Sequence, residues 1–506
     1  MTWSDRHEHT PHFRFDGGDL DCGNGLLLLI RKHLDPLARG QFLEILSSDA
    51  SVEEDLPAWS RLTGNPLLSR VRHPHTCSYL IRKGTASSEE PDAPPEPAHA
   101  PRPHAVPTPS QAAPAEPQKI PPLAVMGIGS WPRPRWLLGA LHKYLQGQMP
   151  EEVFHECADD AVRLAVAAQE RAGVDVITDG EQRRDSYSSF IGSLLDCCQL
   201  IPITDLLPYV DDPEEFAAEL RALDVPAEQV RHPAVLKPLQ RSRPLVEHEL
   251  SFVKTLTSKP IKIALPGPYL LTRTLWLECV SDRVYTTQVD LARDVVRLLQ
   301  EEIAALLASG ASLVQLDEPV LTEVVFGRPK NKRSFMCGAL SEKRGMSEEL
   351  AFASDLLRET VKGFPLERLG LHICRGNWSR SEDVALSGDY GPLMPLLRNI
   401  PVGTLFLEMC TPRAGEWNKL RELPEHCRVG VGVVNQKHDR IETVAEIMAK
   451  AEEAIQLFGP RRVLLNPDCG FATFADNPVA SAQIAEQKLA AIAETSRRLR
   501  ERHGLA

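Results

Sequence analysis

The stretch LGLHICRGN, residues 369–377, has the form of a short buried strand that ends in reactive side chains. Its apolar part runs up to polar residues and a glycine, and His372 and Cys374 stand two residues apart. Side chains alternate along a strand, so these two point to the same side. Seven other runs are short, largely apolar and then polar or glycine-rich: 124–129, 175–178, 261–265, 312–316, 404–407, 428–434 and 462–465.

Helical patterns separate most of these eight runs, at 151–172, 287–308, 348–361, 441–458 and 480–500. Nearly continuous apolar strands that alternate with helices are typical of a parallel sheet covered on both faces. Eight such units predict an α/β fold, a (β/α)8 TIM barrel, over residues 123–506. The stretch 185–258 is too long for one loop, so we expect an insertion with helices of its own.

The composition narrows the class of protein. A chain of 506 residues exceeds what one hydrophobic core supports, so we expect at least two domains. The net charge of −12 argues against a nucleic-acid partner. The longest apolar run, at 26–30, is too short to span a membrane, and the N-terminus has no signal-peptide core. We expect a cytoplasmic protein without a membrane partner, whose 11 cysteines are free thiols, metal ligands or catalytic groups.

The segment 91–122 divides the chain, because it holds 12 prolines and 7 alanines in 32 residues without hydrophobic periodicity. Such a composition cannot bury enough apolar surface to fold. The expected organisation is a small domain at 12–83, a disordered Pro/Ala-rich linker at 84–122 and the barrel at 123–506. The linker is either a passive spacer or a tether that lets one domain reach the other.

The first domain has the pattern of a small two-layer α/β unit. We expect helices at 25–37 and 51–62, together with four strands at 12–20, 41–46, 66–71 and 78–82. Cys22 comes directly before the first helix. There the positive end of the helix dipole and the unpaired backbone N–H groups favour the thiolate form of the cysteine.

This domain resembles the TusA/SirA sulfur-carrier family, through Leu20-Asp21-Cys22 leading into the helix and through 49–62 after the second strand. The resemblance implies a persulfide on Cys22 and a sulfur-relay partner. The family's Cys-Pro-x-Pro is replaced here by Cys22-Gly23-Asn24-Gly25. A structural or docking module with an inert Cys22 is therefore the alternative.

Reactive side chains also end other predicted strands, at the face where (β/α)8 enzymes carry their chemistry. Cys469 follows the eighth strand and Glu408 follows the sixth. With His372 and Cys374 they could converge at the mouth of the barrel. One imidazole and two thiolates suit Zn²⁺, and Glu408 would fill a fourth position that an incoming thiol displaces. Ordinary core packing of these residues is the alternative.

The strand ends resemble the catalytic barrel of the cobalamin-independent methionine synthase family. The motifs occur in family order: IGSWPR (128–133), TDGEQRRDS (178–186), LPGPYLLT (265–272), QLDEPVL (315–321), LHICRGN (371–377), FLEM (406–409), VGVVNQKHDRIET (431–443) and NPDCGFAT (466–473). The resemblance implies that zinc is bound by four residues, His372, Cys374, Glu408 and Cys469.

The same resemblance implies an amino-acid thiol site formed by Ile128, Gly129, Ser130, Glu181, Asp317 and Glu318. Glu181 and Asp317 are suited to hold an ammonium group, and Ser130 with nearby backbone N–H groups is suited to a carboxylate. Salt bridges of these acids with neighbouring arginines are the alternative. Asp317 is also expected to be catalytic, together with His438. His438 resembles the family's acid that protonates the leaving group, although its motif is about one residue short.

The activity implied is methyl transfer to a thiol, in the first place homocysteine, which gives methionine. A free alkyl thiol has a pKa of about 8.5 and is mostly protonated at neutral pH, whereas zinc would hold it as a thiolate. The family's front barrel helps to bind folate, and a sulfur-carrier-like module replaces it here. The methyl donor is therefore either methyltetrahydrofolate or a methylcorrinoid. The alternatives are a coenzyme M type thiol:alkyl transferase, a metal-free decarboxylase of the uroporphyrinogen type and a non-catalytic sulfur-relay protein.

Overall fold

A computed structural model of the chain describes residues 3–4, 6–18, 26–34, 36–49, 52–74, 76–84, 114–145, 148–202, 231–276, 281, 284–327, 333–334, 338–342 and 344–505. Cys22 and most of the predicted linker lie outside these residues. Within the ranges given, the structure has no helix with the length and apolar character that a membrane crossing requires.

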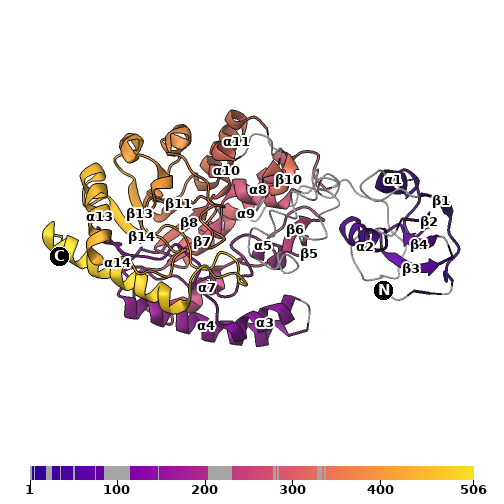
Figure 1. The fold of residues 1–506 in the computed structure, drawn as a ribbon, viewed down its shortest axis with the longest axis horizontal. Helices are drawn as coiled ribbons and strands as arrows, with labels where there is room; N and C mark the ends of the chain where they lie inside the picture. Colours follow the sequence, from indigo (N-terminus) through magenta and orange to yellow (C-terminus); the bar gives the residue numbers. More distant parts are fainter. Residues whose placement is uncertain are drawn as a thin grey trace.

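The larger unit is built on a parallel sheet of six strands in the order β14-β13-β12-β11-β8-β7 (Figure 1). The strands are β7 (Lys262–Pro266), β8 (Leu313–Asp317), β11 (Leu369–Ile373), β12 (Thr404–Leu407), β13 (Arg428–Val434) and β14 (Val463–Pro467). Only the first residue of β13 is more than slightly exposed, because both faces of the sheet are covered. Six of the eight predicted strands are thereby confirmed, as is the α/β class.

The other two predicted strands, at 124–129 and 175–178, form single parallel bridges instead of ladders. The bridged pairs are Val125 with Leu465, Met126 with Val176, and Ile177 with Ile261. The Asp175 carboxylate accepts a hydrogen bond from the Val125 amide at 2.7 Å, so a side chain replaces a backbone partner and interrupts the ladder. The two segments therefore lie between β14 and β7 with few backbone hydrogen bonds.

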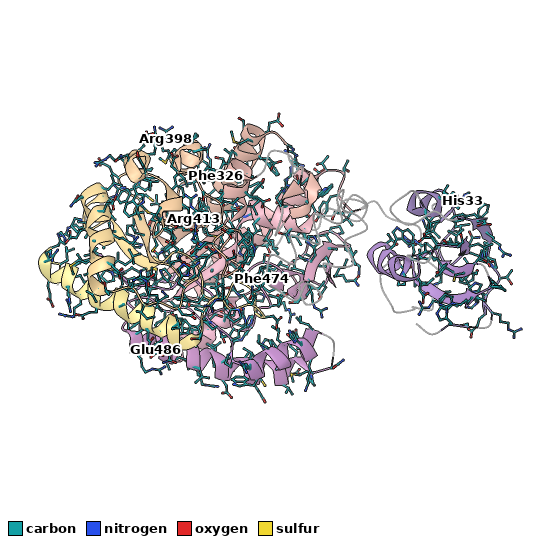
Figure 2. The ribbon with its side chains drawn as sticks, viewed as in Figure 1. His33, Phe326, Arg398, Arg413, Phe474 and Glu486 are labelled. Carbon is teal, nitrogen blue, oxygen red and sulfur yellow. The ribbon has the colours of Figure 1, made fainter. Side chains whose placement is uncertain are left out.

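Long helices pack outside this sheet, and five of them confirm predicted ranges (Figure 1). They are α4 (Glu151–Ala172), α9 (Gln288–Ala308), α11 (Met346–Val361), α13 (Val444–Phe458) and α14 (Ala482–Arg502). Capping boxes at Thr287 and Thr443 explain where α9 and α13 begin. Glu486 of α14, labelled in Figure 2, joins that helix to α4 through an ion pair of 2.8 Å with Arg171.

The insertion at 185–258 contains an antiparallel pair of strands in addition to the helices that the sequence predicts. It comprises α5 (Phe190–Leu194), the antiparallel strands β5 (Cys198–Pro202) and β6 (Arg231–Val235), and α7 (Glu247–Val253). The sequence of β6, RHPAV, does not predict a strand, because the proline at its centre cannot donate a backbone hydrogen bond to a neighbouring strand. The shorter elements of the larger unit are α3 (Arg135–Leu145), α8 (Pro268–Leu275), α10 (Val320–Phe326), α12 (Met394–Leu397), β9 (Arg333–Ser334) and β10 (Gly338–Glu342).

The end of the predicted linker, residues 114–122, is hydrogen-bonded to the larger unit. The Ala115 amide donates to the Leu307 carbonyl at 3.1 Å, and the Ala115 carbonyl accepts from Arg368 at 2.7 Å. The Pro122 carbonyl accepts from Arg500 of α14 at 3.0 Å. Ala115 and Pro122 of the predicted linker thus contact the larger unit, and the domain boundary after residue 122 stays a prediction.

The first unit has the predicted order of elements. They are β1 (Phe13–Asp16), α1 (Leu27–Leu34), β2 (Phe42–Ser47), α2 (Val52–Thr63), β3 (Leu67–Arg72) and β4 (Cys77–Arg82). The sheet has the order β1-β2-β4-β3, and only β1 and β2 are parallel. His33 of α1, labelled in Figure 2, stacks on Phe13 of β1 with ring centroids 4.6 Å apart, so this helix packs against the sheet.

Candidate active site

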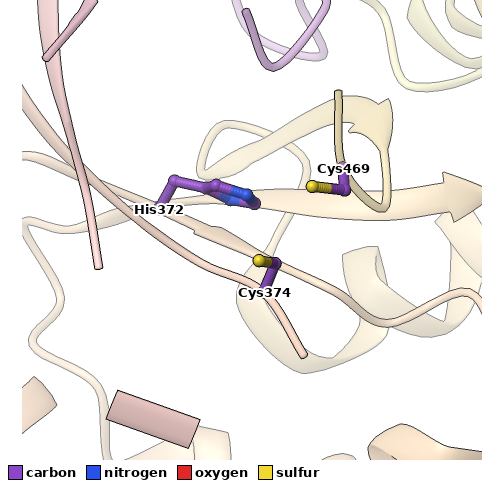
Figure 3. Close-up of side chains that lie close together, drawn as sticks. All are labelled: His372, Cys374 and Cys469. Carbon is purple, nitrogen blue, oxygen red and sulfur yellow. The ribbon is translucent and has the colours of Figure 1, made fainter. Parts of the chain in front are cut away.

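Three side chains that can bind a metal converge beyond the ends of two strands. His372 stands near the end of β11, Cys374 follows β11 directly, and Cys469 lies two residues after β14. One ligand atom from each lies within 4.8 Å of the other two, and all three residues are buried (Figure 3). Two soft sulfurs and one imidazole nitrogen are the donor set that zinc prefers.

The His372 ring is oriented so that one nitrogen is available. Its Nδ1 lies 3.2 Å from the Phe406 carbonyl oxygen, which fixes the proton on that nitrogen. Its Nε2 is buried and makes no hydrogen bond of good geometry to any described residue. A backbone carbonyl behind a metal-binding imidazole is a common arrangement, because it orients the ring and raises its basicity.

The two thiols shift each other's pKa in opposite directions. A hydrogen bond from Cys469 holds the pKa of Cys374 well below its usual range, and the neighbouring His372 acts in the same direction. The pKa of Cys469 is raised, because the same hydrogen bond and its burial favour the protonated form. Cys374 is therefore the thiol of the pair that ionises more readily, and the thiolate is the form that coordinates zinc.

Glu408, the fourth predicted ligand, lies outside this group of three. It is fully buried and directly follows β12. Its carboxylate accepts hydrogen bonds from the Arg375 amide at 3.0 Å and from Arg413 at 2.7 Å (Arg413 is labelled in Figure 2). Its negative charge still contributes to the raised pKa of Cys469, so it stands close to the ligands.

A pocket opens beside these three residues and contains most of the predicted substrate contacts. Its lining comprises Ile128, Ser130, Glu181, Tyr187, Asp317, Pro319, His372, Cys374, Asn377, Trp378, Cys469, Gly470 and Thr473. Two carboxylates thus share one small space with the proposed metal ligands. Such a pocket suits a molecule with a thiol at one end and a positive charge at the other.

Glu181 is held in a strained backbone conformation at this pocket. Its φ angle is 55°, in the left-handed region that residues other than glycine rarely adopt. Gly129 packs beside it, and a Cβ atom there would lie 2.0 Å from Glu181 Oε1, so a side chain at this position would displace the carboxylate. Glu181 Oε2 is buried without a hydrogen-bond partner among the described residues, and burial raises the pKa of this carboxyl. An orphaned acceptor of this kind is suited to a cationic ligand.

Asp317, at the end of β8, is positioned by a buried amide. Its Oδ1 accepts a hydrogen bond from the Gln315 side chain at 2.7 Å. Burial raises the pKa of Asp317 to about 7, against the opposing effect of His372. Its carboxylate and that of Glu181 line the same pocket, so the predicted pair of acids is brought together.

Glu318 is not among the residues that line this pocket, and its substrate contact stays a prediction; the structure gives it a structural role. The residue is fully buried, and its two oxygens accept hydrogen bonds from the Tyr269 amide at 2.8 Å and the Leu270 amide at 3.0 Å. These amides belong to the first turn of α8, whose N–H groups lack partners within the helix. Glu318 therefore caps α8.

The Glu318→Gln substitution should flatten the pH dependence of stability. Burial raises the pKa of Glu318 to about 8 from an ordinary value of 4.5. Between these values the folded chain holds a proton that the unfolded chain has lost, so stability is lost as the pH rises through the folded pKa. As the pH rises from about 5 to about 9, the thermal unfolding midpoint of the native chain should fall more steeply than that of the variant. Equal slopes for the two proteins would contradict this role.

His438 lies at the surface instead of in the pocket. Its side chain is 57% exposed, and its Nε2 forms an ion pair of 2.9 Å with Glu382. Glu382 also accepts hydrogen bonds from Asn435 at 2.6 Å and from Arg413. Its role as the acid thus stays a prediction, with an exposed imidazole beside a carboxylate as its setting.

Sequence reasoning missed two fully buried residues behind the pocket, Lys262 and Gln315. The Lys262 amine donates to the Gln315 side-chain oxygen at 2.6 Å, and Gln315 in turn contacts Asp317. A signal existed for Gln315, since it stands two residues before Asp317 on the same strand and so faces the same side. No sequence signal identified Lys262 as its partner.

Comparisons with known proteins agree with this geometry. Residues 123–200, 218–348 and 387–492 match the family described as "Cobalamin-independent synthase, Catalytic domain". The chain is 26% identical over 384 residues to proteins named methionine synthase from Saccharolobus solfataricus and Sulfurisphaera tokodaii. Each alignment covers 76% of this chain, with 96% of the first relative and 94% of the second.

Two solved structures are similar in fold to this chain. One is a B12-independent methionine synthase from Shewanella sp. W3-18-1 in complex with selenomethionine, with 21% identity and a TM-score of 0.57 over 76% of this chain and 100% of that one. The other is a putative vitamin-B12 independent methionine synthase from Listeria monocytogenes, with 18% identity and a TM-score of 0.53 over 76% of this chain and 99% of that one. At such identities the likeness concerns the fold.

Proposed function

Because this chain belongs to the cobalamin-independent methionine synthase catalytic-domain family and is thus a homocysteine S-methyltransferase, we propose that it activates homocysteine at a zinc ion held by His372, Cys374 and Cys469. The observation that carries the proposal is that these three side chains converge beside a pocket lined by Glu181 and Asp317. Membership of this family disfavours two of the alternative functions, a metal-free decarboxylase and a non-catalytic relay protein.

The three ligands fit zinc in their chemistry. Two sulfurs and a buried imidazole nitrogen, which makes no hydrogen bond of good geometry within the described part of the chain, form a donor set that suits zinc. A zinc ion bound there would lower the pKa of a substrate thiol and so supply a thiolate at neutral pH. Glu408 is the proposed fourth ligand, and Arg413 offers its carboxylate a partner when a thiol takes that place.

The protein's own carboxylates would recognise the other end of the substrate. Glu181 and Asp317 offer acceptors to the ammonium group, and Ser130 lies in the same lining with its hydroxyl 3.3 Å from the Ala472 amide. The two acids would repel a thiol whose remote group is an anion. This disfavours a thiol of the coenzyme M type, which has no ammonium group, and favours an amino-acid thiol.

Methyltetrahydrofolate is the proposed methyl donor. The family and the similar structures are named for independence from cobalamin, which makes a methylcorrinoid the second choice. His438, beside Glu382, is proposed to protonate the leaving nitrogen of the donor. Its exposure would leave it accessible to a donor that approaches from solvent.

We also propose the finer organisation of the chain. The bridges at Val125, Met126 and Ile177 support a closed (β/α)8 ring in which the two bridged segments join β14 to β7. The order of elements in the first unit supports a TusA-like domain at 12–83. Cys22 lies outside the described residues, so its persulfide and a sulfur-relay partner stay predictions. Unaltered sulfur transfer in a Cys22→Ser variant would refute both the persulfide and the sulfur-relay partner.

The test of the proposed function is zinc content followed by thiol binding. We expect about one zinc ion per chain, and a zinc K-edge spectrum that gains a sulfur ligand when homocysteine is titrated. Methionine should then form from methyltetrahydrofolate and not from methylcobalamin. Absence of zinc, or a spectrum that does not respond to homocysteine, would overturn the thiol activation. If methionine formed only with methylcobalamin, the assignment of the methyl donor would change and the proposed thiol site would be unaffected.

A further inference from the structure

A chain of hydrogen bonds runs from a buried lysine to the pocket. The Lys262 amine donates to the Gly127 carbonyl at 2.7 Å and to Gln315 Oε1 at 2.6 Å. Gln315 Nε2 then donates to the Ile128 carbonyl at 3.0 Å and to Asp317 Oδ1 at 2.7 Å. Lys262 and Gln315 are both completely buried, so water does not compete for these bonds.

The lysine determines which way the Gln315 amide faces. An amine bound to two carbonyl oxygens acts only as a donor, whether it carries two hydrogens or three, so it requires the amide oxygen on its own side. The amide nitrogen must then face Ile128 and Asp317, which both offer acceptors. The reversed amide would place donor against donor and acceptor against acceptor, and three hydrogen bonds would be lost.

The amine cannot easily move away from this position. Its nitrogen lies 4.4 Å from the centroid of the Phe406 ring, and Phe406 is itself completely buried. Lys262 begins β7 and Gln315 lies at the centre of the neighbouring β8, in register with Ala264. The direction of the amide is therefore built into two paired strands and not into a loop.

The fixed direction of the Gln315 amide affects the part of the pocket proposed to bind the ammonium group. Gln315 donates to Oδ1 of Asp317 and stabilises the charged form of that carboxylate, which lines the pocket. It also holds the Ile128 carbonyl, whose second lone pair can accept from a ligand. An ammonium group would then meet acceptors from Asp317, Ile128 and Glu181 in fixed positions.

We propose that Lys262 is a positioning residue that acts through Gln315 to give the pocket its selectivity for thiols that carry an ammonium group. The inference rests on the proposed function, in that homocysteine must be the thiol bound. It adds a determinant that touches neither the substrate nor the metal ligands. Its effect should appear in the choice between thiols and not in the thiol chemistry.

The test compares homocysteine with 4-mercaptobutanoate, which is the same thiol without the amino group. Dissociation constants are measured by calorimetry on the zinc-loaded full chain, so that no methyl donor is needed. Lys262→Met should weaken homocysteine at least about tenfold and change 4-mercaptobutanoate by less than about twofold, because a hydrogen bond to a charged group is lost only for the amine. Gln315→Met should have the same selective effect.

The double variant decides whether the lysine acts through the amide. In the double variant, the dissociation constant for homocysteine should be less than about twofold higher than in Gln315→Met alone, because the two residues belong to one chain of hydrogen bonds. Additive effects would overturn the proposal, as would equal weakening of both thiols, which a merely structural role would produce. Native protein that binds neither thiol would instead remove the proposed function.

Two further variants guard against loss of folding. Lys488 is another completely buried lysine, paired with Glu442 at 2.7 Å, and Lys488→Met should leave the preference between the two thiols unchanged. If Lys262→Met does not fold, Lys262→Gln keeps a donor and should retain the selectivity that Gln315→Met loses. Equal loss of selectivity in Lys262→Gln and Gln315→Met would contradict the proposal.

Discussion

Replacing Cys469 with alanine should reduce the zinc content of the purified chain from about one ion to less than about a tenth, since only two of the three converging ligands remain. We expect kcat/KM for homocysteine methylation to fall by about a thousandfold or more, because both the thiolate and its fixed position are lost. Metal content is measured by atomic emission, and turnover by the formation of methionine.

The matched control is Cys427→Ala. Cys427 is also buried, but it stands just before β13 and its thiol contacts the Arg428 carbonyl at 3.3 Å, away from the pocket. This variant should keep its zinc and most of its activity, apart from the modest cost of a small cavity. A Cys469→Ala protein with full zinc content would show that other groups hold the metal.

Glu181→Gln should raise the KM for homocysteine by about a hundredfold while zinc stays bound, because a buried charge that faces an ammonium group is worth about 3 kcal/mol. The substitution keeps the shape of the side chain and removes only the charge. A smaller effect on kcat is expected, since the thiol end of the substrate is untouched. Steady-state kinetics and metal analysis of the same preparation measure both quantities.

Glu302→Gln controls for the loss of a buried carboxylate. Glu302 is completely buried on α9, but its oxygens already accept from the Leu245 and Val246 amides and from Arg241. That variant should lose thermal stability and keep its KM. If Glu181→Gln instead lowered zinc content or left KM unchanged, Glu181 would not be the site of the ammonium group.

The fold was predictable where local pattern and burial agree. Six largely apolar runs became strands, because a strand covered on both faces is apolar over most of its length. The segments at 124–129 and 175–178 have the same pattern, but the Asp175 carboxylate takes up the Val125 amide. Such competition between a side chain and a backbone partner depends on tertiary contacts, which periodicity does not record.

The same distinction holds for the site. The spacing of His372 and Cys374 places them on one side of β11, and the strand end at Cys469 brings in the third ligand. Periodicity cannot show that Arg413 binds Glu408, or that both oxygens of Glu318 cap α8. Those partners are set by side chains that are distant along the chain.

The parallel segments of the larger unit differ in their backbone hydrogen bonding, and this difference separates two properties of the enzyme. The four proposed metal ligands lie in or just after β11, β12 and β14, which belong to the continuous sheet, whereas Ser130 and Glu181 follow the two segments that are joined by single bridges. Substitutions near Ser130 and Glu181 can therefore reshape the recognition of the amino-acid end without disturbing the ladders that hold the metal ligands. If the proposed zinc site holds, this architecture lets the substrate range diverge while the metal site is kept.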